Sequence, residues 1–239
     1  MVSQKMKTIG FIGGMSWEST VVYYELANRK VREMLGGCHS CKCIMLSVEF
    51  DEIQRLQHQN KWDELNAIMA DAARRLEMAG ADIIVLCTNT MHLCESAIKQ
   101  NISIPFLHIA EATGEEIINR KISKVALLGT RFTMEKDFYK ELLRTKYGIE
   151  VLIPTQEERQ QIHNIIYNKL VQGIIDEGSR RKFVSIINCL QVQGAQGVIL
   201  GCTEIPLLIS DADVNIPTLN TTKIHAEKAV EWALSQNLK

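Results

Sequence analysis

The chain repeats itself once along its 239 residues. Three segments recur farther along in the same order, and the matching pairs are 9–14 with 125–130, 80–90 with 194–204, and 104–107 with 216–219. All three pairs share a nearly constant separation of roughly 110 to 120 residues, much longer than a solenoid repeat. A generic junction between a strand and a helix explains any one match, but not three at one spacing. The repeat predicts two similar halves related by a pseudo-two-fold axis.

Short apolar segments alternate with amphipathic segments in both halves. The predicted strands are residues 8–12, 44–48, 83–86, 104–109, 125–128, 149–152 and 198–200. Apolar residues at helical spacing predict helices that start at Ser16, run from Trp62 to Gly80, cover 162–170 and 183–190 on either side of Gly178, and start last at His225. This alternation predicts an α/β fold in which each half is a mostly parallel sheet flanked by helices. We expect one domain from residues 1–104 plus 216–239 and a second from residues 105–215.

Charge and hydropathy exclude several classes of protein. With Lys+Arg 27 against Asp+Glu 28 the net charge is −1, so the chain has no basic excess for binding nucleic acid. No apolar run approaches the roughly 20 residues of a membrane-spanning helix. The first seven residues lack the apolar segment of a signal peptide. We therefore expect a cytoplasmic protein that binds neither nucleic acid nor membrane.

The seven cysteines are an odd number, which in a chain of this length is typical of free thiols in a reducing compartment. Cys38 and Cys41 have the C-x-x-C spacing of a metal site. However, no second pair follows at the usual distance, and the segment leads directly into the predicted strand 44–48. We interpret it as a loop with incidental thiols and expect no metal.

Small polar residues gather where the predicted strands end, at 13–16, 88–90, 129–130 and 202–204. Ligands of open parallel sheets bind beyond the C-terminal ends of the strands. A pseudo-two-fold axis would turn these clusters toward each other. The active site is therefore expected in a cleft between the two domains, where one small molecule is contacted from both sides.

The glycine turn at 10–14 lacks the G-x-G-x-x-G spacing of dinucleotide-binding proteins, and no G-x-x-x-x-G-K-[ST] motif occurs in the chain. The helix that follows it could bind an anion such as a carboxylate at its N-terminus. A tight turn without a ligand fits the motif equally well.

Cys202 directly follows an apolar strand and precedes Thr203 and Glu204. Backbone N–H groups at such a strand end can stabilise a thiolate, although most buried cysteines only fill space. Thr88 holds the matching position in the first half. Cys87 lies one residue earlier, so strand alternation points it to the other face and favours a structural role.

The remaining candidates carry weaker signals. Cys94 and Cys189 lie on predicted helices and are interpreted as core or surface thiols. His92 and His225 each either orient a loop or cap a helix, and no histidine has the spacing of a metal-ligand set. We assign catalysis to neither histidine.

With these motifs the sequence resembles the aspartate/glutamate racemase family. The family's strand ends read C-N-T-x-H in one half and G-C-T-E in the other, and this chain has T-N-T-M-H at 88–92 and G-C-T-E at 201–204. Further matching segments are 13–19, 127–130 and 224–226. The resemblance spans essentially the whole chain. It is closest to the bacterial racemases of broad specificity that prefer L-aspartate and L-glutamate and carry threonine at the first catalytic position.

The resemblance implies an isomerase that works without pyridoxal phosphate or any other cofactor, takes aspartate and glutamate as substrates, and forms a homodimer. It implies catalytic roles for Thr88 and Cys202. It implies substrate-binding roles for Met15, Ser16, Gln57, Asn89, Thr90, Thr130, Thr203 and Glu204. Some members of the family hold the distal carboxylate with an Arg and a Lys, and near the matching positions this chain offers Gln57, with Arg55 and Lys169 as alternatives.

Racemisation without a cofactor needs one group that removes the α-proton and another that returns a proton from the opposite face. A thiol suits both tasks, whereas the hydroxyl of Thr88 is a much weaker acid and is expected to donate or relay a proton. We therefore predict asymmetry, in which Cys202 takes the proton from one enantiomer, which the resemblance implies is the L-form, and Glu204 contacts the substrate ammonium group.

Two other functions fit the same residues. A one-cysteine decarboxylase or a maleate-type cis–trans isomerase of the same superfamily would use Cys202 as donor or nucleophile. A non-catalytic amino-acid-binding protein would keep the polar clusters without the chemistry.

Overall fold

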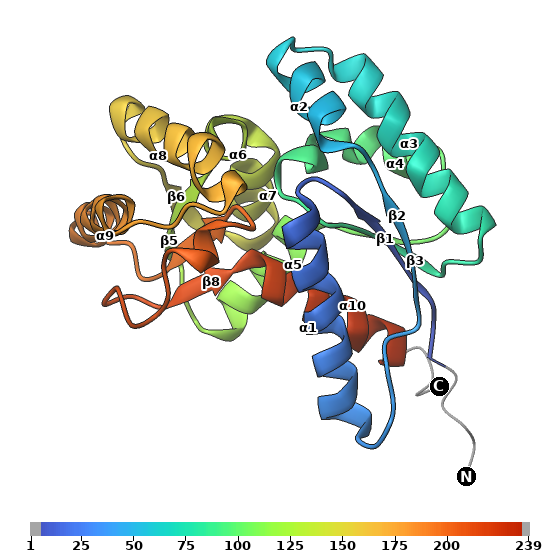
Figure 1. The fold of residues 1–239 in the computed structure, drawn as a ribbon. Coiled ribbons are helices and arrows are strands. Elements are labelled where there is room, and N and C mark those ends of the chain that lie inside the picture. The colour runs from blue at the N-terminus through green and yellow to red at the C-terminus, as the bar shows by residue number, and fades with distance from the viewer. Residues whose placement is uncertain (1–5, 236–239) are drawn as a thin grey trace. The chain divides into compact units, whose positions relative to one another are not determined.

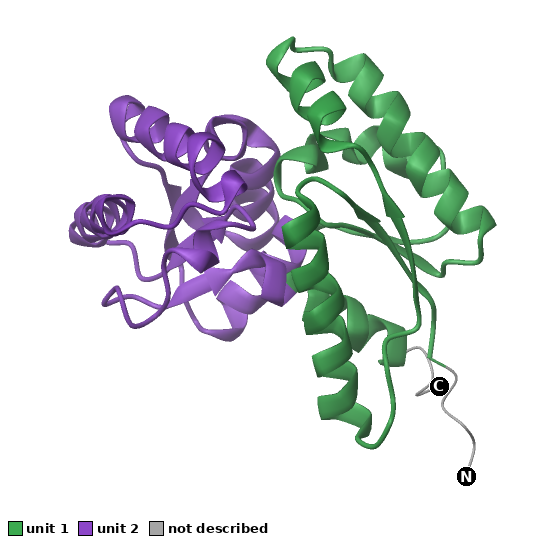
Figure 2. Ribbon diagram, viewed as in Figure 1, with its two compact units in different colours: residues 1–108, 225–239 green, residues 109–224 purple. Residues whose placement is uncertain are grey.

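The computed structural model describes residues 6–235, and the chain divides into two compact units (Figure 2). Unit 1 comprises residues 1–108 and 225–239, and unit 2 comprises residues 109–224. The first five residues, on which the expectation about a signal peptide largely rests, lie outside the described residues. Among residues 6–235, no helix has both the length and the apolar character needed to cross a bilayer.

Unit 1 contains a four-stranded parallel sheet in the order β2-β1-β3-β4 (Figure 1). Its strands are β1 (Ile9–Gly13), β2 (Cys43–Ser47), β3 (Ile83–Leu86) and β4 (Phe106–Leu107). Its helices are α1 (Trp17–Leu35), α2 (Phe50–His58), α3 (Trp62–Met78), the 3-10 helix η1 (Thr90–Cys94), α4 (Glu95–Gln100) and most of α10 (Thr221–Ser235). The inner strands β1 and β3 are buried along their whole length, which requires the continuous apolar runs seen in the sequence.

Unit 2 contains a second parallel sheet in the order β6-β5-β7-β8. Its strands are β5 (Lys124–Gly129), β6 (Glu150–Leu152), β7 (Val198–Gly201) and β8 (Thr218–Asn220). Its helices are α5 (Ile109–Asn119), α6 (Arg131–Glu135), α7 (Asp137–Tyr147), α8 (Gln156–Asn168), η2 (Leu170–Gln172), α9 (Glu177–Val192) and η3 (Ile205–Leu207). The two sheets share one strand order, so the prediction of two similar parallel α/β halves is confirmed.

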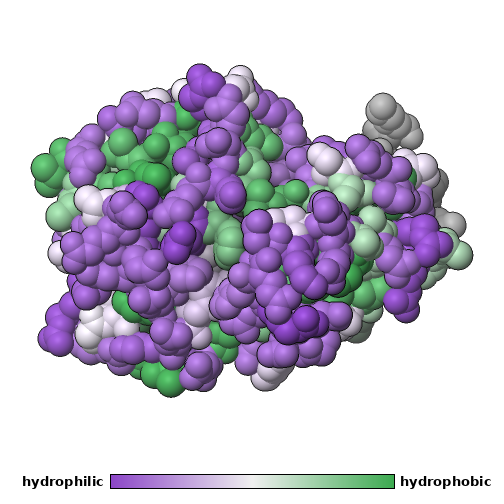
Figure 3. Space-filling view, turned by 90° about the horizontal axis from the view of Figure 1, so that it is seen from above, coloured by the Kyte–Doolittle hydropathy of each residue, from purple (hydrophilic) through white to green (hydrophobic). Residues whose placement is uncertain are grey.

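In unit 1, alternate residues of β1 join separate cores on the two faces of the sheet. In unit 1, Ile9 and Phe11 of β1 pack with Tyr23 of α1, whereas Ile12 packs with Leu65 of α3. Helices therefore cover both faces of the sheet, and this double cover is the reason a parallel sheet is stable. Hydrophilic residues predominate on the surface shown in Figure 3, with hydrophobic residues scattered among them, as is normal for a globular protein.

The helix after the last strand of each sheet contributes its apolar side chains to the core of the other unit. After β4, α5 adds Ile109 and Ile117 to the core of unit 2, and after β8, α10 adds Ala229 and Val230 to the core of unit 1. The units therefore change at residues 109 and 225, where the sequence suggested 105 and 216. The difference arises because β4 pairs with β3 and β8 pairs with β7.

Several predicted element boundaries differ from the structure. The strand expected at 104–109 is limited to Phe106–Leu107, and the helix expected at 162–170 ends at Asn168. The last helix begins at Thr221 and not at His225. Gly178 lies inside the first turn of α9 because the preceding Asp176 caps that helix, its carboxylate accepting the N–H of residue 179 at 2.9 Å.

Candidate active site

The first cluster of predicted site residues lies at the C-terminal edge of the sheet in unit 1. β1 ends at Gly13 and leads into residues 15–16, while Thr88 follows β3. The N–H of Cys87 donates to the carbonyl of Ile12 at 2.9 Å, so the two segments leave the sheet side by side. β2 and β3 flank β1 on opposite sides. The ends of β1 and β3 therefore form a topological switch point, which is where open parallel sheets bind ligands.

Hydroxyl groups fix the glycine turn after β1. Ser16 caps α1 by accepting the N–H of Ser19 at 3.4 Å. The hydroxyl of Thr20 donates to the Ser16 carbonyl at 3.0 Å and accepts the N–H of Gly14 at 2.8 Å. A side chain on Gly13 would collide with Thr20, and Gly14 has a φ of +92°, so both positions require glycine.

Thr88 is half-buried, whereas the neighbouring Cys87 lies in the hydrophobic core, as strand alternation predicts. Met15, Asn89 and Thr90 are buried beside it in the same unit. Unit 1 therefore brings together all but one of the site residues predicted in its part of the chain at two neighbouring strand ends.

Gln57, the remaining residue, reaches this cluster from α2. Its side chain is buried, and its Nε2 donates to the sulfur of Met91 at 3.0 Å. The alternatives for binding a distal carboxylate are placed differently. Arg55 is exposed on α2, and in unit 2 the ammonium of Lys169 pairs with Asp176 at 2.9 Å.

The second cluster lies at the equivalent edge of unit 2. Thr130 follows β5 and caps α6 by accepting the N–H of Thr133 at 3.3 Å, while Cys202 follows β7. The strands end at a paired Gly129 and Gly201. A Cβ on Gly129 would stand 2.7 Å from the carbonyl oxygen of Gly201, so two glycines allow the strand ends to approach this closely.

The thiol of Cys202 is paired with a carboxylate. Its Sγ donates to Oε2 of Glu204 at 2.9 Å, and the hydroxyl of Thr203 donates to the same oxygen at 2.8 Å. Burial raises the pKa of the Cys202 thiol well above its usual range, the Glu204 carboxylate raises this pKa further, and the N–H groups of Glu204 and Thr203 oppose both effects. Cys202 therefore carries its proton at neutral pH and directs it at a group able to accept it.

Glu204 was expected to contact the ammonium group of a substrate. In the structure one of its carboxylate oxygens accepts two hydrogen bonds from within the cluster, and the contact with ammonium stays a prediction. Tyr167 on α8 is a further candidate residue of the active site, which we did not predict from the sequence. Burial raises the pKa of its phenol, and the acidic groups of Cys202 and Glu204 add to this shift. Its ring packs on the ring of His163, with the two centroids 4.6 Å apart. The two residues lie one helical turn apart in the sequence, and this spacing could have indicated Tyr167 from the sequence alone.

All seven cysteines lie within the described residues, and none forms a disulfide. Cys38 is exposed and Cys41 is buried in the loop before β2. Within residues 6–235, no three His, Cys, Asp or Glu side chains are placed to share a metal ion.

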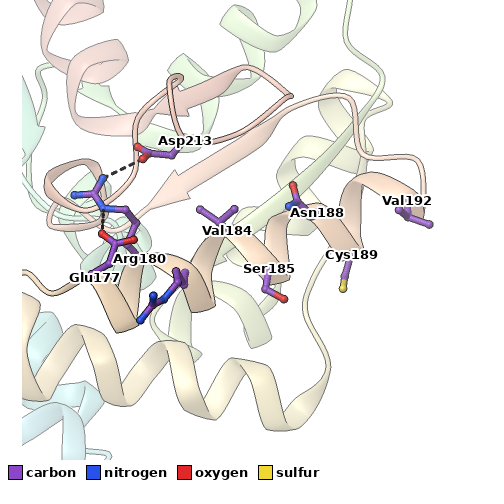
Figure 4. A pocket seen from close by; sticks show the side chains of 9 residues that line it. Glu177, Arg180, Val184, Ser185, Asn188, Cys189, Val192 and Asp213 are labelled. Carbon is purple, nitrogen blue, oxygen red and sulfur yellow. Dashed lines mark hydrogen bonds and ion pairs between the residues drawn. The ribbon is translucent and has the colours of Figure 1, made fainter.

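A separate surface pocket runs along α9 in unit 2 (Figure 4). Its volume is 590 Å³, and none of the predicted site residues lines it. Arg180 in this pocket pairs with Asp213 at 3.0 Å and with Glu177 at 3.4 Å. Three of its charged groups therefore pair with one another, and the pocket does not include the clusters at the strand ends.

Known proteins resemble the chain over nearly its full length. Residues 12–229 match the family model described as Asp/Glu/Hydantoin racemase. The broad specificity amino-acid racemase RacX of Bacillus subtilis is 28% identical over 232 residues, which are 95% of this chain and 98% of that protein. A candidate Asp/Glu racemase from Yersinia pestis is 47% identical, with a TM-score of 0.90 over 96% of this chain and 100% of the other. An aspartate racemase homologue from Pyrococcus horikoshii is 36% identical, with a TM-score of 0.83 over 95% and 99% of the two chains.

The doubled parallel α/β fold and this likeness to racemases over nearly the full chain thus identify an isomerase of the racemase class. The chain belongs to the Asp/Glu/hydantoin racemase family, as its sequence motifs predict.

Proposed function

We propose that the protein is a cofactor-independent amino-acid racemase that acts on aspartate and glutamate, with Cys202 and Thr88 on opposite faces of the α-carbon. The observation that carries this proposal is the Cys202 thiol held 2.9 Å from a carboxylate oxygen of Glu204 at a strand end. Thr88 occupies the equivalent strand end in the other unit. Two related sites with different proton-transfer groups suit a reaction that moves one proton off and another on.

Catalysis starts with transfer of the Cys202 proton to Glu204. The thiolate is then stabilised by the N–H groups of Thr203 and Glu204, which favour its charged form. The thiolate removes the α-proton of the L-enantiomer, so that an S–H bond forms, the C–H bond breaks, and its electron pair moves into the α-carboxylate. The hydroxyl of Thr88 gives its proton to the opposite face while it takes one from water, which avoids a free alkoxide. The hydroxide so formed takes the proton that Glu204 holds, so Thr88, Glu204 and the water all return to their starting forms.

Polar groups at both strand ends support binding of the substrate. Ser16, Asn89 and Thr90 in unit 1, and Thr130 and Thr203 in unit 2, offer donors to carboxylate oxygens and to the charge that develops on them. Gln57 is the proposed contact for the distal carboxylate. Met15 contributes backbone and shape, and Glu204 is the proposed partner of the ammonium group. By the same family resemblance, we expect a cytoplasmic homodimer.

The test is chiral chromatography of a panel of L-amino acids, run with wild type and Cys202→Ser. We expect wild type to invert L-aspartate or L-glutamate and the variant to lose at least about 100-fold in rate, a normal loss for a proton-transfer group. Turnover of malonates or maleate without inversion would favour a decarboxylase or a cis–trans isomerase. Saturable binding without loss of optical rotation would favour a non-catalytic protein.

A further inference from the structure

The imidazole of His92 holds the backbone of Thr88. Nδ1 of His92 lies 2.8 Å from the carbonyl oxygen of Thr88, and the N–H of Thr88 donates to the carbonyl of Leu86 at 2.8 Å. Both backbone polar groups of Thr88 are therefore bound. The loop that carries its hydroxyl has little freedom to rotate.

The ring of His92 is itself fixed in one orientation. It is 1% exposed and packs against Phe106, His108 and His225, with ring centroids 5.4, 4.6 and 5.6 Å away. A carbonyl oxygen only accepts, so Nδ1 must carry the proton. Burial, together with the two neighbouring histidines, lowers the pKa of His92 well below its usual range, which keeps the ring neutral.

In unit 2, a different donor binds the backbone carbonyl of the residue that matches Thr88. In the repeat that places Thr88 over Cys202, His92 corresponds to Pro206, which has no donor. The carbonyl of Cys202 instead accepts the backbone N–H of Ile205 at 3.3 Å. The imidazole donor thus belongs only to the unit that carries threonine in place of cysteine.

We propose that His92 is a positioning residue for Thr88, which aims the threonine hydroxyl at the face of the substrate opposite Cys202. This inference rests on the proposed racemase function. A hydroxyl that relays a proton must be oriented within about 0.5 Å, and misplacement of a reacting group by about 1 Å costs on the order of 100-fold in rate. Loss of His92 should therefore slow only the step that uses Thr88.

The experiment follows L-aspartate in heavy water and separates two products. Deuterated L-aspartate reports proton exchange at Cys202 alone, and deuterated D-aspartate reports inversion through Thr88. In His92→Leu we expect inversion to fall by about 10-fold or more while exchange within the L-form stays within about twofold. Damage to the fold as a whole would lower both products together.

Two conservative variants test the role of His92 even if His92→Leu does not fold. The side-chain amide of His92→Asn can stand where Nδ1 stands, so inversion should return to within a few-fold of wild type. The amide of His92→Gln lies one bond farther out, where it misses the Thr88 carbonyl, and inversion should stay low. The exposed variant His39→Gln should match wild type throughout.

The possible failures are distinct. Equal loss of exchange and inversion in His92→Leu, no loss in it, or equal activity of the Asn and Gln variants would overturn the role of His92 alone. A wild-type protein that neither exchanges nor inverts any amino acid would overturn the racemase proposal and this inference with it.

Discussion

His225 shows how a single buried side chain can depend on staying neutral. Its Nε2 lies 3.0 Å from the carbonyl of Leu107 and must donate, so Nδ1 is free to accept the hydroxyl proton of Tyr23 at 2.9 Å. Protonation would turn Nδ1 into a donor, and it would then face the hydroxyl of Tyr23, which is also a donor in this hydrogen bond. Burial lowers the pKa of His225 from its usual 6.5 to about 4, and the ring of His92, which also titrates below its usual range, lies 5.6 Å away.

These shifts predict a loss of stability in mild acid. The folded-state pKa of His225 lies below the unfolded value, so between pH 6.5 and about 4 the unfolded chain binds a proton that the folded chain does not. The free energy of unfolding should therefore fall as the pH falls through this window, by at most about 1.4 kcal/mol per pH unit for each histidine. Urea denaturation at several pH values measures this slope.

Two variants show whether His225 is responsible for the slope. His225→Gln keeps a donor for the Leu107 carbonyl but cannot become charged, so its slope should be shallower than that of wild type. His39→Gln changes an exposed histidine and should keep the wild-type slope. A parallel fall in all three proteins would assign the acid sensitivity to other groups.

At the scale of elements, the ends of β5 and β7 depend on two glycines. A Cβ on Gly129 would stand 2.7 Å from the carbonyl oxygen of Gly201, and that oxygen cannot retreat without moving the strand that carries Cys202. Gly129→Ala should lower the free energy of unfolding by about 1 to 3 kcal/mol, the usual cost of overpacking. The activity of the folded fraction should also fall, since Thr130 and Cys202 follow these glycines directly.

A matched control for Gly129→Ala is Gly178→Ala in the first turn of α9. The nearest atom there is the carboxylate oxygen of Asp176 that caps the helix, at 3.0 Å, so alanine crowds one side chain and no strand. Alanine favours a helix over glycine by up to about 1 kcal/mol, which offsets this crowding. This variant should be neutral or stabilising in urea denaturation. If the two variants have the same stability, the close approach of the strand ends is not what requires Gly129.

The sequence predicted the helices and strands better than it predicted which core each of them packs against. Apolar runs and helical spacing located seven of the eight strands that the structure describes, all but β8, and several of the longer helices, because burial imposes a visible pattern. The exchange of α5 and α10 between the cores left no such mark, since an apolar face does not reveal which core it joins. Likewise, the motif at Cys202 marked a candidate site at a strand end, but the hydrogen bond to Glu204 depends on side-chain rotamers that no spacing encodes.

At the scale of the whole molecule, the two units share details below the level of the fold. Tyr23 in unit 1 and Tyr139 in unit 2 are both fully buried and match in the repeat. Each tyrosine hydroxyl forms a hydrogen bond with the helix that follows the last strand of the other sheet. Tyr23 bonds to His225 of α10 at 2.9 Å, and Tyr139 bonds to Thr113 of α5 at 3.0 Å. Duplication therefore explains the scaffold, and divergence at a few positions explains why its two halves differ in chemistry.

The position of Thr88 is where this divergence can be reversed. It matches Cys202 in the repeat, so Thr88→Cys would place a thiol at both strand ends. A thiol has a pKa near 8.5 and is a far stronger acid than a hydroxyl, so a second base becomes available near neutral pH. In heavy water, we expect deuterium exchange into D-aspartate to rise by about 10-fold or more, which brings it closer to the rate for L-aspartate.

Thr88→Ser is the control for this change, because it keeps a hydroxyl at the same position and should preserve the wild-type ratio of D to L exchange. Mass spectrometry after chiral separation measures both rates in one reaction. If Thr88→Cys leaves the ratio unchanged, or Thr88→Ser shifts it as far, then the residue at position 88 does not set the asymmetry. The preference for one enantiomer would then have to arise from substrate binding, because the two units would no longer differ in their proton-transfer groups.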